Sequence, residues 1–501
     1  MLEIELKLAA TPNLVLPDLV GVGDVAAVRE LPALELRSVY FDTEDLRLAR
    51  SGATLRHRSG EPGGPVWTLK LPQGDGRRGA LQRDEHEFRG APRAIPPEAD
   101  DLATALTRGA PLRRTAELRT RRQRLELLDA AGDVLAEVAD DRVSVIEERR
   151  IAARFREIEI ERRNATDGQL RAAAGRLRDA GAIDAEPVPK VVRALGARAT
   201  ALPDVVRPDV RPQSPAGDVV RRAIADGMLR LVAHDAGTRA GDAESLHQMR
   251  VATRRLRSDL RTLGPLLEPA WTDELREELR WLGTALGTVR NLDVQLEDLR
   301  PLAVDLQLEV EPLFARLEER RAEAFAALLE TLRGERYLGL LERIVAAYAT
   351  PMLAPAAVEE RAESLRSYVD DAWRRVVRRA KPLAHDSPAD DYHAVRIAAK
   401  RARYAAEAVR PGLPPSDADG ATGFARQMAR LQDLLGGMQD AYTAAMVIDE
   451  IAVKGRWRPK PALAAGRLIE REERRAADAR SAFPKLWRSV RRRRHRSWLS
   501  G

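Results

Sequence analysis

Two short segments of this 501-residue chain place carboxylates in rows. LEIELKL at 2–8 and FREIEIE at 155–161 alternate polar with apolar residues, so each row lies on one face of an extended strand. The charged residues on these faces are Glu3, Glu5, Lys7, Glu157, Glu159 and Glu161. Like charges crowded on one strand face repel, and carboxylate oxygens suit a hard divalent metal such as Mg2+. If the rows point inward, they predict a metal site.

Other alternating segments carry cations on one face. The pairs are Arg56 with Arg58, Thr68 with Lys70, Arg83 with Glu85, and Arg119 with Arg121. If these faces also point inward, the bases can hold a phosphate chain by charge-assisted hydrogen bonds. Acids and bases together favour phosphoryl transfer, which depends on positioning and charge neutralisation more than on a protein nucleophile. A solvated outer face is the alternative that spacing alone leaves open.

The second half of the chain contains two similar basic segments, LHQMRVATRRLR at 246–257 and YHAVRIAAKRAR at 392–403. Spacings of three and four residues place their bases in one stripe on each helix. The stripes are His247, Arg250, Arg254, Arg257 and Arg261, then His393, Arg396, Lys400 and Arg403, with Arg255 and Arg401 flanking them. Like charges at i,i+4 destabilise a helix by about 0.2–0.5 kcal/mol per pair, so repeated stripes indicate anion binding.

The aromatic residues beside these stripes are Tyr392 and Tyr404. Proteins that bind single-stranded nucleic acid stack its bases on aromatic side chains. Because few aromatics lie beside the stripes, inorganic polyphosphate is the favoured partner and nucleic acid is the alternative. The two histidines either donate to phosphate or have a capping or core role. A catalytic zinc site is not favoured because neither histidine has a second imidazole nearby.

Hydrophobic periodicity divides the chain into two regions. Residues 1–200 follow period two with glycine and proline clusters, which predicts an antiparallel sheet or barrel with one helix near 166–180. Prolines within 201–215 predict a semi-rigid linker. From 216 to 485 the period is 3.6, which predicts an all-α region. The basic residues of 486–501 predict a solvated tail, which nucleic acid or an anionic surface could also bind.

The helical region repeats itself. WLGTALGTVRNLDV at 281–294 follows the first basic stripe, and RLQDLLGGMQDAYTA at 430–444 follows the second at similar spacing. Recurrence in order predicts an internal duplication, with halves at about 216–350 and 358–485. Each half is expected to be a small helical bundle.

Composition limits the class of protein. The chain has no cysteine, a net charge of +7 and 32% charged residues. Disulfides and thiolate chemistry are therefore excluded, and an anionic partner is favoured. The N-terminus does not resemble a signal peptide, and no segment has the length of apolar sequence that a membrane span needs. We expect a cytoplasmic protein, with polyphosphate granules as a further place of association.

The first region resembles the CYTH, or triphosphate tunnel metalloenzyme, superfamily. EIELK at 3–7 matches its ExExK signature, and further motifs follow in the family's order: YFDT at 40–43, LRHR at 55–58, TLK at 68–70, RDE at 83–85, EIEIE at 157–161 and PKVVRAL at 189–195. The resemblance implies an eight-stranded antiparallel β tunnel that hydrolyses or rearranges triphosphates with Mg2+ or Mn2+. The fold class is then α+β, a β tunnel followed by duplicated helical bundles.

The resemblance also implies roles for individual residues. The implied metal ligands are Glu3, Glu5, Glu159 and Glu161, with Glu157 and Glu85 as supporting acids and Asp141 as either a metal ligand or a supporting acid. The implied phosphate contacts are Lys7, Arg56, Arg58, Lys70, Arg83, Arg121 and Lys190. Arg121 is chosen from a cluster that also contains Arg119 and Arg122. No aromatic pair clearly forms a base pocket, so hydrolysis of inorganic or small triphosphates is favoured over an adenylate cyclase. The intact acidic rows argue against a non-catalytic binder, because a protein that only binds polyanions gains nothing from them.

The second region, about 215–485, resembles CHAD domains, the conserved-histidine alpha-helical domains. The matching motifs are HxxRVxxRRLR, LGxVRNLDV, HxxRIxxKRxRY and LQDLLGxxxD. It departs from the pattern at Asn291, Gln439 and the weakly matched segment 300–370. The resemblance implies a polyphosphate-binding helical module, and the order of the two regions resembles that of CYTH–CHAD inorganic triphosphatases.

Overall fold

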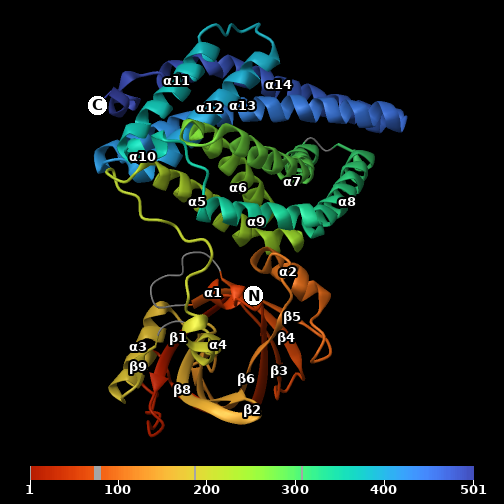
Figure 1. Cartoon of the computed structure of the whole chain (residues 1–501). Helices are drawn as coiled ribbons and strands as arrows, with labels where there is room; N and C mark the ends of the chain where they lie inside the picture. Colours follow the sequence, from red (N-terminus) through yellow and green to blue (C-terminus); the bar gives the residue numbers. More distant parts are fainter. Residues whose placement is uncertain (1, 73–80, 186–187, 306–307, 501) are drawn as a thin grey trace. The chain divides into compact units, whose positions relative to one another are not determined.

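The computed structural model describes residues 2–72, 81–185, 188–305 and 308–500. The chain forms two compact units, Met1–Asp204 and Val205–Gly501 (Figure 1). The first contains an antiparallel sheet and the second is helical, so the predicted α+β layout is confirmed. Residues 201–214, within the described ranges, form neither helix nor strand.

The sheet of the first unit has nine strands among the described residues. They are β1 (Leu2–Ala10), β2 (Ala27–Asp42), β3 (Thr54–Ser59), β4 (Val66–Pro72), β5 (Leu81–Phe88), β6 (Arg113–Leu128), β7 (Val134–Glu147), β8 (Arg150–Arg162) and β9 (Ile183–Asp184). Their order is β5-β4-β3-β2-β6-β7-β8-β1-β9. Strand β1 also pairs with β5, so the first and the last of the longer strands in this order pair with each other. The ninth strand, not predicted from the sequence, is the two-residue β9 beside β1.

Short helices flank this sheet. They are α1 (Arg47–Arg50), α2 (Pro97–Thr107), α3 (Asp167–Asp179) and α4 (Lys190–Leu195), followed by a 3-10 turn at Gly196–Arg198. The predicted helix near 166–180 is α3, which begins with a capping box between Thr166 and Gln169. Helix α4 begins with Lys190 directly after Pro189, a residue type that favours the start of a helix.

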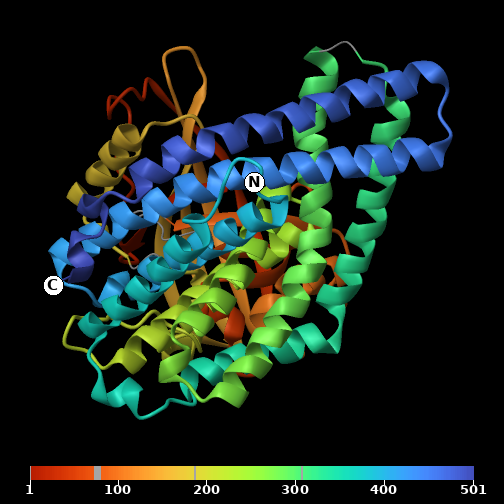
Figure 2. The same cartoon turned by 90° about the horizontal axis from the view of Figure 1, so that it is seen from above.

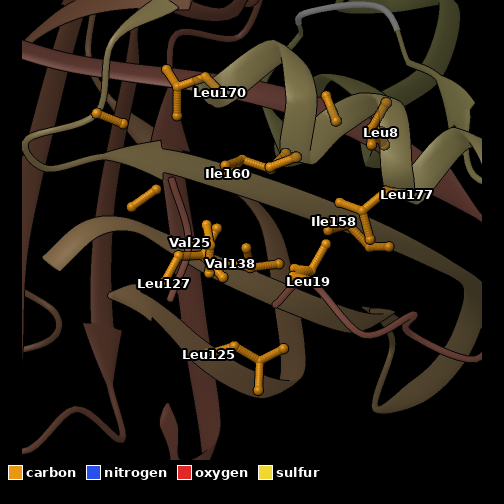
Figure 3. Packing of buried hydrophobic residues seen from close by; sticks show 14 of the residues in the cluster. Leu8, Leu19, Val25, Leu125, Leu127, Val138, Ile158, Ile160, Leu170 and Leu177 are labelled. Atoms are coloured by element: carbon orange, nitrogen blue, oxygen red, sulfur yellow. The ribbon is translucent and has the colours of Figure 1, made fainter. Parts of the chain in front are cut away.

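The hydrophobic core beside α3 determines which strand faces are apolar. Leu170 and Leu177 of α3 belong to the same buried cluster as Leu125 of β6 and Ile158 and Ile160 of β8 (Figure 3). Side chains alternate across a strand, so the charged residues between these apolar ones face the opposite side of the sheet. Burial of the isoleucines thus directs the glutamates of β8 away from α3.

The second unit consists of long helices. They are α5 (Ala216–Arg239), α6 (Ala243–Thr262), α7 (Pro269–Asp305), α8 (Glu311–Arg333), α9 (Glu335–Ala349), α10 (Ala356–Glu359), α11 (Arg366–Ala380), α12 (Ala389–Val409), α13 (Pro415–Gly455) and α14 (Pro459–Val490). The basic helices α6 and α12 contact each other, and α13 lies along α14 (Figure 2). In the described ranges, no helix combines the length and apolar character that crossing a membrane requires.

The C-terminal segment is packed, which corrects the prediction of a solvated tail at 486–501. Trp487 and Trp498 are buried. The ring of Trp487 lies 5.7 Å from that of Trp373, and the ring of Trp498 lies 6.2 Å from that of Phe424. A Cβ on Gly420 would lie 2.6 Å from Trp498 Cγ, so the indole packs against bare helix backbone. Burial of these two rings outweighs the solvation that the many neighbouring arginines favour.

Candidate functional site

The charged strand faces of the first unit line one cavity with a volume of about 280 Å3. Residues predicted to form the site and found in its lining are Glu5, Lys7, Arg56, Arg58, Lys70, Glu85, Glu159, Glu161 and Lys190. These faces therefore point inward, and the alternative of a solvated outer face is wrong for them. The side chains of Glu3 and Arg83 lie outside the described part of the chain, although their backbones pair between β1 and β5.

A cluster of ion pairs connects β1, β8 and α4. Lys190 Nζ lies 2.6 Å from Glu159 Oε1, 2.7 Å from Glu157 Oε1 and 3.0 Å from Asp141 Oδ2. Lys7 Nζ lies 2.8 Å from Glu159 Oε1, because Lys7 and Glu159 are direct partners in the β1–β8 register. Both lysines thus neutralise the acidic row of β8 from within the protein.

These contacts fix the charge states of the cluster. Burial alone lowers the pKa of Lys190, but Glu157, Glu159 and Asp141 raise it well above its ordinary value. Burial alone raises the pKa of Glu159, but Lys190, Lys7 and Arg122 hold it well below its usual range. Acids and bases are therefore both ionised near neutral pH.

Arg121 does not face the cavity, which corrects its predicted role as a phosphate contact. Its side chain is 70% exposed and lies 3.7 Å from Glu35, which is 80% exposed. The cavity is lined instead by Arg122 and Arg124. Leu125 lies on the same face of β6 as Arg121, because the two are four residues apart, and it belongs to the core beside α3. That apolar residue was the sequence signal that identifies Arg122 as the inward arginine.

Asp141 contacts two bases, which fits its predicted role as a supporting acid better than that of a metal ligand. It is fully buried, and Arg122 donates from Nε to Oδ1 at 2.8 Å and from Nη2 to Oδ2 at 2.6 Å. Lys190 also approaches Oδ2. Arg122 further donates to Glu159 at 3.0 Å. Both Asp141 oxygens are therefore engaged by protein cations, and the residue positions Arg122 and Lys190.

Other residues also line the cavity, namely Tyr40, Glu61, Arg124 and Glu137. Tyr40 begins the YFDT motif noted in the sequence, and sequence reasoning missed the other three. Burial raises the pKa of the Tyr40 hydroxyl, but Arg56 and Arg58 lower it overall. Arg58 donates to Glu61 at 2.9 Å and to Ser38 Oγ at 3.2 Å, which orders its guanidinium. Tyr40 and Glu61 thus surround the arginines of β3.

The chemistry of the acidic residues fits a hard divalent cation. Glu5, Glu159 and Glu161 offer carboxylate oxygens to one cavity, the ligand type that Mg2+ and Mn2+ favour. Within the described ranges, no three acidic or histidine side chains converge closely enough to hold a metal ion. The predicted row on β1 also includes Glu3, whose side chain lies outside the described part of the chain.

A second basic cavity, of about 540 Å3, lies in the helical unit. Its lining includes His247, Arg250, Arg254 and Arg257 of α6, Arg396 and Lys400 of α12, Arg290 of α7 and Asp440 of α13. The two predicted stripes therefore meet across one space, which we call the central basic cavity. Burial lowers the pKa of Lys400, and Arg254, Arg396, Arg250 and Arg257 add to this, giving a value of about 7.

Other predicted residues lie elsewhere. Arg255 and Arg403 both pair with Glu407, at 2.8 Å and 2.9 Å. Arg261 and Arg401 line a separate cavity. His393 lines neither, and in the described ranges its buried Nδ1 has no hydrogen-bond partner. The prediction that all of these residues bind polyphosphate thus lacks support from the lining of the central basic cavity.

Helix capping does not explain the histidines. Helix α6 begins at Ala243, and Asp242 caps it by accepting a hydrogen bond from the Ser245 backbone. Helix α12 begins at Ala389, after Pro388. His247 and His393 lie inside these helices, beyond the reach of a cap, so the capping alternative is wrong.

The duplication appears in three dimensions as a repeated arginine–glycine contact. A Cβ on Gly287 of α7 would lie 3.4 Å from Arg250 Nε, and a Cβ on Gly436 of α13 would lie 3.4 Å from Arg396 Nε. Each glycine leaves room for the arginine three residues after the histidine of its own half. Both glycines occur in the repeated sequence motifs, but their packing role was not predicted.

Comparison with known proteins agrees with this two-unit organisation. The CYTH domain model matches residues 1–184, and the CHAD domain model matches residues 222–449. The chain belongs to the family of proteins that carry a CYTH domain followed by a CHAD domain. Among relatives, the uncharacterized protein MT2285 of Mycobacterium tuberculosis strain CDC 1551 / Oshkosh is 32% identical over 529 residues, covering 98% of this chain and 97% of the relative.

Solved structures are similar to part of the chain. PptA from Streptomyces chartreusis is 23% identical with a TM-score of 0.46, covering 55% of this chain and 100% of its own. The CHAD domain from the plant Ricinus communis is 26% identical with a TM-score of 0.44, covering 56% of this chain and 94% of its own. Because both TM-scores are below 0.5, the family assignment rests on the domain models and the full-length relative.

Proposed function

We propose that the chain is a divalent-metal-dependent, cytoplasmic triphosphatase joined to a polyphosphate-binding module. One observation carries the proposal: Glu5, Glu159 and Glu161 share a cavity with Arg56, Arg58 and Lys70. An acidic row beside a basic one suits a metal–triphosphate complex, whereas a site that only binds polyanions gains nothing from the acids. Membership of the CYTH family, which contains triphosphatases and cyclases, supports the same class of reaction.

The basic and the acidic residues of the cavity have different proposed roles. Arg56, Arg58 and Lys70 bind phosphate oxygens, and Arg122 reaches the same space from β6. Glu3, Glu5, Glu159 and Glu161 would hold Mg2+ or Mn2+, which supplies neutralisation of the charge that develops on the phosphoryl group. Lys190 and Lys7 keep Glu159 ionised and oriented. The preferred substrate is inorganic triphosphate or another small triphosphate.

For the helical unit, we propose that inorganic polyphosphate binds in the central basic cavity. Arginines from α6 and α12 face the same space, which suits a flexible chain of phosphates. Polar side chains such as Gln432, Gln439 and Thr443 complete the lining. No aromatic residue is part of this lining in the described ranges, so a stacked base finds no platform there.

The test of the catalytic proposal is phosphate release from tripolyphosphate by the full chain, with Mg2+, with Mn2+ and with EDTA. Activity is expected only with metal, and Glu159→Gln is expected to lower kcat at least about 100-fold because it removes charge stabilisation in the site. Glu35→Gln is the matched control because Glu35 lies on the outer face. ATP with product analysis separates hydrolysis from cyclisation. Cyclic AMP as the main product would show that the protein is a cyclase and not a triphosphatase. Absence of turnover with either substrate would show that the protein binds polyanions without hydrolysing them.

A further inference from the structure

The helical unit contains another cavity, of about 800 Å3, where the C-terminal end of α6 and one side of α11 approach α12. Arginines from each of these helices line it: Arg261 of α6, Arg375, Arg378 and Arg379 of α11, and Arg401 of α12. We call it the α11 cavity. It is distinct from the central basic cavity, since Arg257 and Lys400 line the central one and Arg261 and Arg401 line this one.

The arginines of the α11 cavity lack counter-ions. In the described ranges none of them forms a salt bridge with a carboxylate. Asp371 lines the cavity, but its carboxylate is directed to Arg374 at 4.0 Å. Burial lowers the pKa of Arg401, and the neighbouring Arg261 and Arg375 lower it further. Five arginines and one aspartate at one cavity leave a net positive charge, which favours an anion.

The rest of the lining differs from that of the central basic cavity. It is apolar, with Pro265, Ala372, Ala394, Ile397 and Ala398, together with Tyr368. The Tyr368 hydroxyl donates to Glu360 at 3.3 Å, which fixes the phenol in place. A bare phosphate chain gains nothing from an apolar wall, whereas a ring gains by leaving water. Cavities of this size with an apolar wall and a few charged groups are typical of small-molecule sites.

We propose that the α11 cavity binds a nucleoside polyphosphate. Its phosphates contact the guanidinium groups of Arg261, Arg375 and Arg401, and its base lies on the wall formed by Ile397 and the alanines. Guanidinium planes also stack on bases, so arginines at the rim serve both parts of the ligand. This site is separate from the proposed triphosphatase site and from the proposed polyphosphate site, and neither needs to be correct for it to exist.

The test is a fluorescence titration of the full chain with mant-ATP in EDTA. Every protein carries Arg56→Ala and Lys70→Ala, so that binding in the β-sheet cavity does not contribute. Binding is expected, and Arg375→Glu with Arg379→Glu should weaken it at least about tenfold through loss of phosphate contacts. Arg474→Glu, on the exposed face of α14 beside Glu470, should leave it unchanged.

A second variant separates charge from shape. Ile397→Trp fills the apolar wall and leaves every arginine in place, so it should weaken mant-ATP binding while tripolyphosphate binding persists. ATP should displace mant-ATP at a concentration about tenfold lower than tripolyphosphate does, since only ATP uses the wall. The proposal is overturned by absence of mant-ATP binding, by equal displacement by the two competitors, or by an Ile397→Trp protein that binds mant-ATP as the parent does. A matched circular dichroism spectrum for each variant excludes unfolding as the cause.

Discussion

Lys190 Nζ lies 2.6 Å from Glu159 Oε1, and this contact ties the first turn of α4 to the acidic row of β8. The same ammonium contacts Glu157 and Asp141, so one base orders acids on two neighbouring strands. A charged cluster that is assembled before any ligand arrives needs little reorganisation during a reaction. The site is therefore organised around a lysine that follows the last long strand.

Replacement of Lys190 by methionine should reduce both stability and turnover. The change leaves buried carboxylates without their main counter-charge, which costs about 3–5 kcal/mol when one partner of a buried pair is removed. Urea unfolding of the first unit should therefore shift to lower denaturant, and tripolyphosphate hydrolysis should fall. Lys454→Met is the control, because Lys454 pairs with Glu450 on the surface. Equal stability of the two variants would contradict the role of Lys190.

Neighbouring arginines on β6 should behave differently. Arg122→Ala removes contacts with Asp141 and Glu159, so we expect loss of most tripolyphosphate hydrolysis, about 10-fold or more, as is typical for removal of a charge that orders a catalytic site. Arg121→Ala should leave kcat and KM unchanged, because its side chain faces away from the cavity. Steady-state kinetics of the two variants gives a direct comparison. Greater sensitivity at Arg121 would reverse the assignment of strand faces.

Polyphosphate binding should weaken as pH rises through neutrality. The pKa of Lys400 is lowered to about 7, so this side chain is protonated below that pH and neutral above it. The charged or titratable groups that share its cavity are His247, Arg250, Arg254, Arg257, Arg280, Arg290, Arg396, Asp298 and Asp440. Affinity measured by calorimetry should fall between about pH 6 and about pH 8, and Lys400→Arg should flatten this change.

The same shift affects stability without ligand. A base whose pKa is lower in the folded than in the unfolded state takes up fewer protons when folded. The free protein should therefore become more stable as pH rises from about 7 towards the ordinary lysine pKa of 10.5. Lys400→Met should remove this contribution in urea titrations at matched pH. An unchanged slope in the variant would show that Lys400 titrates normally.

Charge reversal should distinguish the central basic cavity from general attraction. Arg254→Glu should weaken polyphosphate binding at least about tenfold, and binding should also weaken with added salt. Arg474→Glu is the matched control, since Arg474 lies on the exposed face of α14 beside Glu470. Equal losses in the two variants would point to net charge alone.

The C-terminal indole should stabilise the helical unit. Trp498 is buried against Gly420 and Phe424, and truncation of a buried tryptophan to alanine costs about 3–5 kcal/mol. Trp498→Ala should therefore lower the melting temperature of that unit. Trp457→Ala, at the end of α13, is a comparison at a less buried indole. A solvated tail would show no change for Trp498.

Period and motif order predicted the layout and most of the cavity lining, because alternating patterns fix which residues share a strand face. They could not choose among Arg119, Arg121 and Arg122, since the choice depends on which face of β6 meets α3. That information lay in Leu125 and Leu127, whose apolar side chains are buried beside α3. The partners of Asp141 could not be predicted either, because Arg122 and Lys190 come from separate elements that no local pattern connects.

The repeated contacts of Arg250 with Gly287 and of Arg396 with Gly436 bear on the direction in which a ligand chain enters the central basic cavity. Two arginines held by the same kind of contact, one from each half, therefore line the central basic cavity from α6 and from α12. Inorganic polyphosphate is a chain whose two ends are chemically identical, unlike a nucleic acid with its distinct 5′ and 3′ termini. Under the proposed polyphosphate binding, either end of the chain would meet an arginine held in the same way, Arg250 or Arg396, so we expect binding not to depend on which end enters first.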